Sequence, residues 1–147
     1  MPRTIVIAGG GRNVGKTRLA EALAEILGDA ATIKIGVHAA RGEKNPLFFR
    51  AGTPLADVAA AAGDRAWLVV ESGAILDDPD AEIALVIFLP AAGGDKPGAE
   101  RRRARAHVVR GRPLDRGERE EIRRRLGVNE DVLSKILGAV EAPWPPP

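Results

Sequence analysis

Two kinds of hydrophobic pattern follow one another along the chain. Short, continuous apolar runs, which are typical of strands covered on both faces of a sheet, occupy residues 4–8, 67–70 and 83–89. Apolar residues spaced three or four positions apart, which indicate helices with one buried face, recur in residues 15–27, 55–62 and 129–140. Strands that alternate with helices predict a three-layer α/β fold, with a mainly parallel sheet of about five or more strands and helices on both faces.

Residues that favour caps set the limits of the helices. Gly28 suits the C-terminal cap of the first helix, and Thr53 followed by Pro54 suits the N-terminal cap and first residue of the second. Asp115 and Glu118 have the spacing of a capping box, which predicts a helix that ends at Leu126. Asn129 is expected to cap the last helix.

The remaining segments are assigned from alternation, glycine and proline. Alternating Ile33, Ile35 and Val37 predict a second strand over residues 31–37. We further expect a short fifth strand over residues 106–109, loops over 38–50 and 91–98, one domain over 1–142 and a proline-rich tail over 143–147. Trp144 is expected to hold this tail against the body of the protein.

The segment after the first apolar run carries the pattern G-x-x-x-x-G-K-T, from Gly10 to Thr17. A strand pattern precedes it and a helix pattern follows it, which is the context that a phosphate-binding loop requires. Backbone N–H groups of such a loop, together with the start of the next helix, bind an anion. We therefore predict a fold of the P-loop NTPase type. The expected contacts are Gly10, Gly11, Arg12, Asn13, Val14, Gly15, Lys16, Thr17 and Arg18.

Three side chains are candidates for the chemistry of this site. Lys16 should reach the β- and γ-phosphates, and the Thr17 hydroxyl should hold Mg²⁺. Glu71 follows a buried strand, where nucleotide-binding proteins place a carboxylate associated with Mg²⁺. Glu71 is thus a second candidate Mg²⁺ ligand and, with Lys16, a candidate catalytic residue. The alternative is an ordinary polar residue that closes a strand.

Further candidates follow other strands, because ligands of a doubly wound sheet bind outside the carboxyl ends of its strands. His38, Arg41, Lys44 and Arg50 either contact phosphate or belong to a solvated loop, and Lys34 either reaches the strand end or is an exposed lysine. Lys96 and Arg101 to Arg103 form either a lid over the phosphates or a loop without function.

The nucleotide is not fixed by the sequence. Gly9, Gly11 and Gly15 are spaced as G-x-G-x-x-x-G, one residue longer than a dinucleotide-binding fingerprint. The N-K-x-D pattern of guanine-nucleotide switches has no counterpart in residues 108–115. GTP and ATP therefore both remain candidates.

Composition excludes several classes of site. The chain has no cysteine, which excludes disulfides and thiolate chemistry, and only two histidines, which argue against a multi-histidine metal site. No apolar run reaches the length of a membrane span, and no signal peptide is visible, so we expect a cytoplasmic protein without membrane contact.

The net charge of +2 is unevenly distributed. Residues 101–125 hold eleven arginines against four acids. Such a segment either binds an acidic protein partner or forms a solvated surface. Aromatic residues that would stack on bases are nearly absent there, which argues against nucleic acid.

Four stretches resemble the MobB family of molybdopterin-guanine-dinucleotide biosynthesis proteins, relatives of the dimeric nucleotide-binding GTPases and metallochaperones. They are GGGRNVGKT (residues 9–17), IKIGVH (33–38), VVESG (69–73) and LVIF (85–88). The resemblance implies a three-layer α/β fold, binding of Mg·GTP or Mg·ATP, weak hydrolysis, a homodimer and an accessory role in molybdenum cofactor maturation. It places the phosphate contacts on residues 10–17 and the strand-end acid at Glu71.

Three functions are consistent with these features. The first is a nucleotide-binding accessory protein that is a slow NTPase. The second is a small-molecule kinase of the same fold, with an acceptor pocket at residues 38–50. The third is a nucleotide-gated binding module that docks a partner on residues 101–125.

Overall fold

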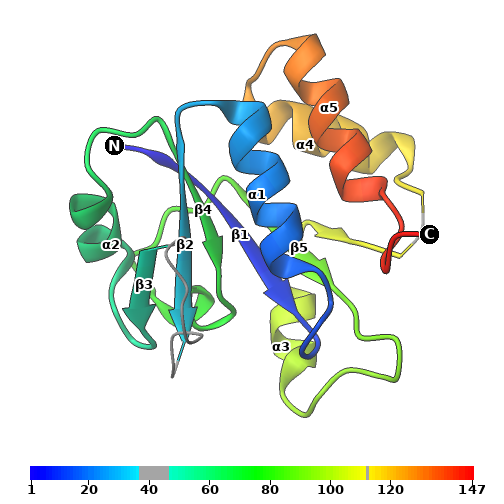
Figure 1. Ribbon diagram of the computed structural model, residues 1–147, viewed down its shortest axis with the longest axis horizontal. Coiled ribbons are helices and arrows are strands. Elements are labelled where there is room, and N and C mark those ends of the chain that lie inside the picture. The colour runs from blue at the N-terminus through cyan, green and yellow to red at the C-terminus, as the bar shows by residue number, and fades with distance from the viewer. Residues whose placement is uncertain (37–46, 112) are drawn as a thin grey trace.

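The structure is a computed structural model that describes residues 1–36, 47–111 and 113–147 (Figure 1). His38, Arg41 and Lys44, which the sequence offers as phosphate contacts, lie outside this described part. No helix within it is long and apolar enough to cross a bilayer.

Within the described residues, six strands form one sheet. They are β1 (Arg3–Gly9), β2 (Ala30–Gly36), β3 (Leu47–Arg50), β4 (Trp67–Glu71), β5 (Leu85–Leu89) and β6 (Val108–Val109). Their order across the sheet is β3-β2-β4-β1-β5-β6, and every neighbouring pair is parallel. The carboxyl ends of the strands consequently lie along one edge, and the predicted fold class is confirmed.

Helices cover both faces of the sheet. They are α1 (Lys16–Leu27), α2 (Leu55–Ala62), α3 (Ala99–Ala104), α4 (Arg116–Leu126) and α5 (Glu130–Glu141), with a short 3-10 helix η1 (Ala74–Asp77). Figure 1 shows α1 crossing in front of the sheet, with α4 and α5 beside it. Ile5 and Ile7 of β1 share a buried core with these three helices, whereas Val6 and Ala8 share one with α2, η1 and α3. Burying each large apolar side chain is worth about 1.5–3 kcal/mol, so the strand ends have a rigid base.

Most of the predicted caps are confirmed. Gly28 caps the end of α1. Asp115 and Glu118 bond each other's backbone N–H groups in a complete capping box, and the Asn129 side chain accepts from the N–H of Val132. Thr53, however, does not cap α2.

At α2 the expected cap is replaced by a residue from another segment. The Thr53 hydroxyl donates to the carbonyl oxygen of Arg50. The first N–H of the helix, that of Leu55, is accepted instead by the carboxylate of Asp78, at 2.9 Å. A sequence window around the helix start does not contain Asp78, so the pattern alone favours Thr53.

Two elements differ from the sequence-based expectation. β3 lies in a segment expected to be loop, where Phe48 pairs in register with Lys34 of β2 and Phe49 packs against the core. α3 lies in the arginine-rich segment and is anchored by the buried Ala99. Both elements are too short for a hydrophobic period to show, and tertiary packing defines them.

Candidate functional site

The loop between β1 and α1 has the left-handed backbone conformations of an anion-binding nest. Asn13 has φ 56° and Gly15 has φ 89°, and Gly15 is also the N-terminal cap of α1. The positive φ values thus fall on Asn13 and Gly15 rather than on Gly10 or Gly11. Asparagine tolerates this conformation better than most residues other than glycine.

Two bonds from outside the loop turn its carbonyl groups outward. The carbonyl oxygen of Asn13 accepts from Trp144 Nε1 at 2.7 Å, and that of Val14 accepts from the Arg110 guanidinium. In a trans peptide the next N–H points the opposite way, so the N–H groups of Val14 and Gly15 point toward the inner side of the loop. Among the described residues neither group donates a backbone hydrogen bond. They are therefore oriented to receive an anion.

Glycines at the start of the loop allow close packing rather than an unusual backbone. A Cβ on Gly9 would lie 2.8 Å from Val14 Cγ2 and 3.0 Å from Lys16 Cδ. Gly9 precedes the motif, yet it is the residue against which the Lys16 side chain packs. A Cβ on Gly10 would overlap with the carboxylate of Asp95.

Lys16 is the centre of a group of positive charges. Burial and the charge of Lys96 lower its pKa below the ordinary value of 10.5, Lys34 and Arg102 lower it further, and Glu71 acts in the opposite direction. These cations come from β2, from the loop after β5 and from α3. Because they repel one another, an anion bound beside Lys16 would relieve the repulsion.

The structure joins the two candidate Mg²⁺ ligands. The Thr17 hydroxyl donates to Glu71 Oε1 at 2.7 Å. Glu71 ends β4, pairs in register with Ile7 of β1 and is only 4% exposed. A hydroxyl beside a carboxylate suits Mg²⁺, which binds through one or two protein oxygens together with phosphate and water. Among the described residues no group of three acids, histidines or cysteines is placed so that it could hold a metal ion, so phosphate oxygens would have to complete this site.

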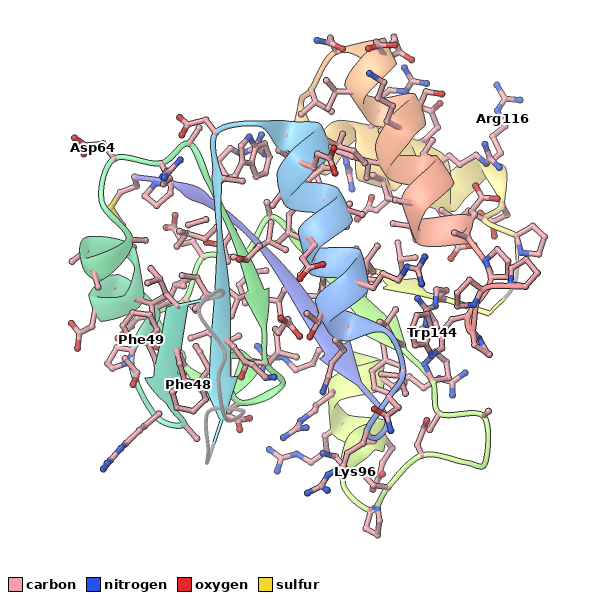
Figure 2. All side chains as sticks on the ribbon, viewed as in Figure 1. Phe48, Phe49, Asp64, Lys96, Arg116 and Trp144 are labelled. Atoms are coloured by element: carbon pink, nitrogen blue, oxygen red, sulfur yellow. The ribbon has the colours of Figure 1, made fainter. Side chains whose placement is uncertain are left out.

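The loop after β5 is attached directly to the phosphate-loop motif. The N–H of Lys96 donates to the carbonyl oxygen of Gly10 at 2.7 Å, and the Asp95 carboxylate accepts from the N–H of Ala91 at 2.9 Å. Arg102 of α3 packs against Gly73, where any Cβ would overlap with it. Lys96 and Arg102 therefore belong to the site. Figure 2 shows the Lys96 side chain beside α3, at the lower end of the sheet.

Other predicted residues lie elsewhere. Arg103 pairs with Asp95 at 3.4 Å. Arg12 and Arg18 are exposed, in the loop and at the start of α1. Arg50 is exposed at the end of β3, which β2 and β4 separate from β1.

Three members of the site carry no signal in the sequence motif. Gly9, Arg110 and Trp144 contact the loop, but two of them are about a hundred residues away along the chain. The sequence does predict that Trp144 holds the tail to the body, and its bond to Asn13 confirms this. That the same bond orients the phosphate-loop motif emerges only from the structure.

No protein-family model, curated protein or solved structure matches this chain. What the site can bind is therefore inferred from its own geometry and from the loop pattern.

Proposed function

We propose that this protein binds a nucleoside triphosphate with Mg²⁺ and hydrolyses it slowly. The observation that carries the proposal is the group of cations around Lys16, which faces a loop whose Val14 and Gly15 N–H groups are turned inward. These N–H groups and the Lys16 ammonium would bind the β- and γ-phosphates.

Thr17 and Glu71 would hold the metal ion. Mg²⁺ supplies charge neutralisation across the β- and γ-phosphate oxygens. Glu71 already accepts the hydrogen bond of the Thr17 hydroxyl, and its charge is the acidic one that acts on the pKa of Lys16. The residues thus fit a Mg·NTP complex in both charge and donor chemistry.

The more specific assignment follows the resemblance to the MobB family. It adds a homodimer and an accessory role in molybdenum cofactor maturation to the proposal, in the cytoplasm. Because residues 108–115 contain no N-K-x-D pattern, the proposal includes both guanine and adenine as the base of the nucleotide.

Calorimetry with GTP, ATP and their diphosphates, with and without Mg²⁺, tests this function. We expect Lys16→Ala to weaken triphosphate binding at least about 100-fold, because a charge-assisted contact in a partly buried site is lost. Lys135→Ala is the matched control, since Lys135 lies exposed on α5 and pairs only with Asp131 there. Both variants should keep the circular dichroism spectrum of the parent. Tight triphosphate binding by Lys16→Ala would refute the proposal.

A second candidate function is phosphoryl transfer to an anionic small molecule. A cleft of about 480 Å³ lies between η1 and α3, and its charged lining residues are Asp77, Lys96, Arg101, Arg102 and Arg105. Lys96 and Arg102 belong to both this cleft and the charges around Lys16, so an anionic acceptor there would lie next to the γ-phosphate. Labelled ATP offered with phosphorylated and carboxylated acceptors distinguishes the two functions, because transfer to an acceptor favours the kinase and release of phosphate alone favours the NTPase.

A further inference from the structure

A second cleft opens on the outer side of the phosphate loop. Its volume is about 890 Å³, which lies within the range of small-molecule sites. Four segments far apart in the sequence form it: the loop itself at residues 12–14, the loop after β5 at 90–93, residues 110, 111 and 113 after β6, and residues 141–145 at the end of α5 and beyond. Most of the lining is alanine, glycine and proline, and the charged groups are Arg12, Arg110 and Glu141.

Of the described residues that line this cleft, Trp144 is the single aromatic one. Its Nε1 donates to Asn13, and its ring lies against Gly15, where a Cβ would be only 2.7 Å from a ring carbon. The Arg110 guanidinium lies 5.9 Å from the ring centre. The side chain is nevertheless 37% exposed, so it is held in place and still offers surface. Figure 2 shows it between the C-terminal tail and the start of α1.

The cleft and the phosphate loop share residues. Arg12, Asn13 and Val14 line the cleft, while the N–H group of Val14 points to the inner side of the loop. A ligand with phosphates on the inner side can therefore reach the cleft by passing over the loop. Glu141, the acid in the lining, is bonded to Arg119 at 2.7 Å, which leaves the cleft favourable for an anionic ligand.

We infer that this cleft binds the nucleoside of the bound triphosphate, with the base stacked on Trp144. The inference rests on the proposed function, since it concerns the other end of the same ligand. Proline and alanine surround the indole and supply apolar contact for a base and a sugar. Aromatic stacking accepts any base, in agreement with the absence of a guanine motif. The C-terminal tail is thereby part of the ligand site.

Calorimetry with GTP, ATP and inorganic tripolyphosphate, all with Mg²⁺, tests the inference on the full chain. We expect at least one nucleotide to bind about tenfold or more tightly than tripolyphosphate, because stacking on an aromatic side chain adds affinity that bare phosphate lacks. Trp144→Ala should reduce this preference to less than about threefold, because nucleotide affinity loses the stacking term as well as the loop-orienting bond to Asn13, whereas tripolyphosphate affinity loses only the effect of that bond. Trp144→Phe keeps an aromatic ring without the Nε1 donor and should keep most of the preference.

The possible failures are distinguishable. If neither nucleotide nor tripolyphosphate binds, the proposed function itself fails. If tripolyphosphate binds as tightly as both nucleotides, or if Trp144→Ala weakens all three ligands equally, the cleft does not hold a nucleoside and Trp144 only shapes the loop. Tighter nucleotide binding by Trp144→Ala would show that the tail obstructs the site, which also overturns the inference.

Fluorescence gives an independent measurement. The chain has two tryptophans, and Trp67→Phe leaves Trp144 as the single emitter. The Arg3 guanidinium lies over the Trp67 ring, 4.8 Å from the centre of that ring. Trp67 does not belong to the lining of the cleft. Nucleotide should quench Trp144 in this variant, whereas tripolyphosphate at saturation should not. Equal spectra with both ligands would contradict stacking on the indole.

Discussion

Two basic regions of this protein differ in how their charges are neutralised. Arginines of α4 pair with acids at the protein surface: Arg125 bonds Glu121 at 2.7 Å in a part-buried pair, Arg124 bonds the same carboxylate, and Arg119 bonds Glu141 of α5. Around Lys16, by contrast, cations from three separate segments face a single recorded acid, Glu71.

The comparison shows that local density of arginine is a poor guide to anion binding. Residues 101–125 are the most basic stretch of the sequence, yet acids one helical turn away neutralise much of α4. Near Lys16 the positive charges are few, but three cations and one acid act on its ammonium, and Lys16 itself is partly buried, where screening is weak. An acidic partner on residues 101–125 stays a prediction, and it would have to compete with the existing pairs.

Removing one charge from each region gives the largest expected contrast. Lys96→Met should weaken tripolyphosphate and nucleotide binding about tenfold, because one of the cations around Lys16 is lost. Arg124→Met, on a side chain that is 73% exposed, should change affinity by less than about twofold. Titration calorimetry at low and moderate salt measures both. Equal effects of the two variants would mean that binding follows net charge and not the site.

The local part of the site could be predicted from sequence, and its supports could not. Residues 10–17 are predicted because strand, loop and helix are adjacent in the chain, and Glu71 because it ends a buried strand. The bond from Trp144 to Asn13 and that from Arg110 to Val14 join residues 131 and 96 positions apart. No periodicity reports such contacts, whereas the strand-end rule does offer Lys96 as a residue near the phosphates.

The fold shows the same division. The apolar runs of β1, β4 and β5 identify strands covered on both faces. β3 is not predicted from the sequence because its four residues gain their strand structure from pairing with β2. α3 is not predicted because a segment rich in arginine has no apolar face. Elements that depend on partners distant in sequence are those that propensity and pattern miss.

The charge of Lys16 should lower the stability of the ligand-free protein. This is a second difference between the region around Lys16 and the region of α4. The pKa of Lys16 is lowered in the folded protein, so the unfolded chain binds the lysine proton more tightly. The stability of the fold is therefore reduced at every pH below the lowered pKa, and it recovers as the pH rises toward 10.5. Lys16→Met should therefore raise the melting temperature at pH 8, while abolishing triphosphate binding. Lys135→Met on α5 should leave it unchanged. A lower melting temperature for Lys16→Met would show that the lysine stabilises the empty loop, contrary to the charge repulsion described.

The paired arginines of α4 still act at short range, on His107. Burial and the charge of Arg125 lower the pKa of His107 below 6.5, and Glu121 opposes the shift. Neutral His107 accepts the N–H of Val86 on its Nδ1 at 2.9 Å, and a protonated ring cannot. Because the folded pKa is the lower one, this contribution is complete above pH 6.5 and is lost as pH falls below it.

We expect the free energy of unfolding to fall by about 0.5 kcal/mol between pH 7 and pH 5, near the lower limit for a single hydrogen bond because His107 is only half-buried. His107→Asn keeps an acceptor at the position of Nδ1 without a titrating ring, and it should flatten the profile in urea titrations across this range. Arg125→Gln should raise the pKa of His107, measured by NMR, and make the loss of stability smaller, because that loss ends at the folded pKa. An unchanged pKa would mean that the Arg125 charge does not contribute to it. A raised pKa would show that Arg125 still acts on nearby His107 although it is paired with Glu121. Pairing would then weaken the field of the α4 arginines only at longer distances. Around Lys16 the recorded charges are three further cations and one acid, and this excess of positive charge is the physical reason to look for the ligand there.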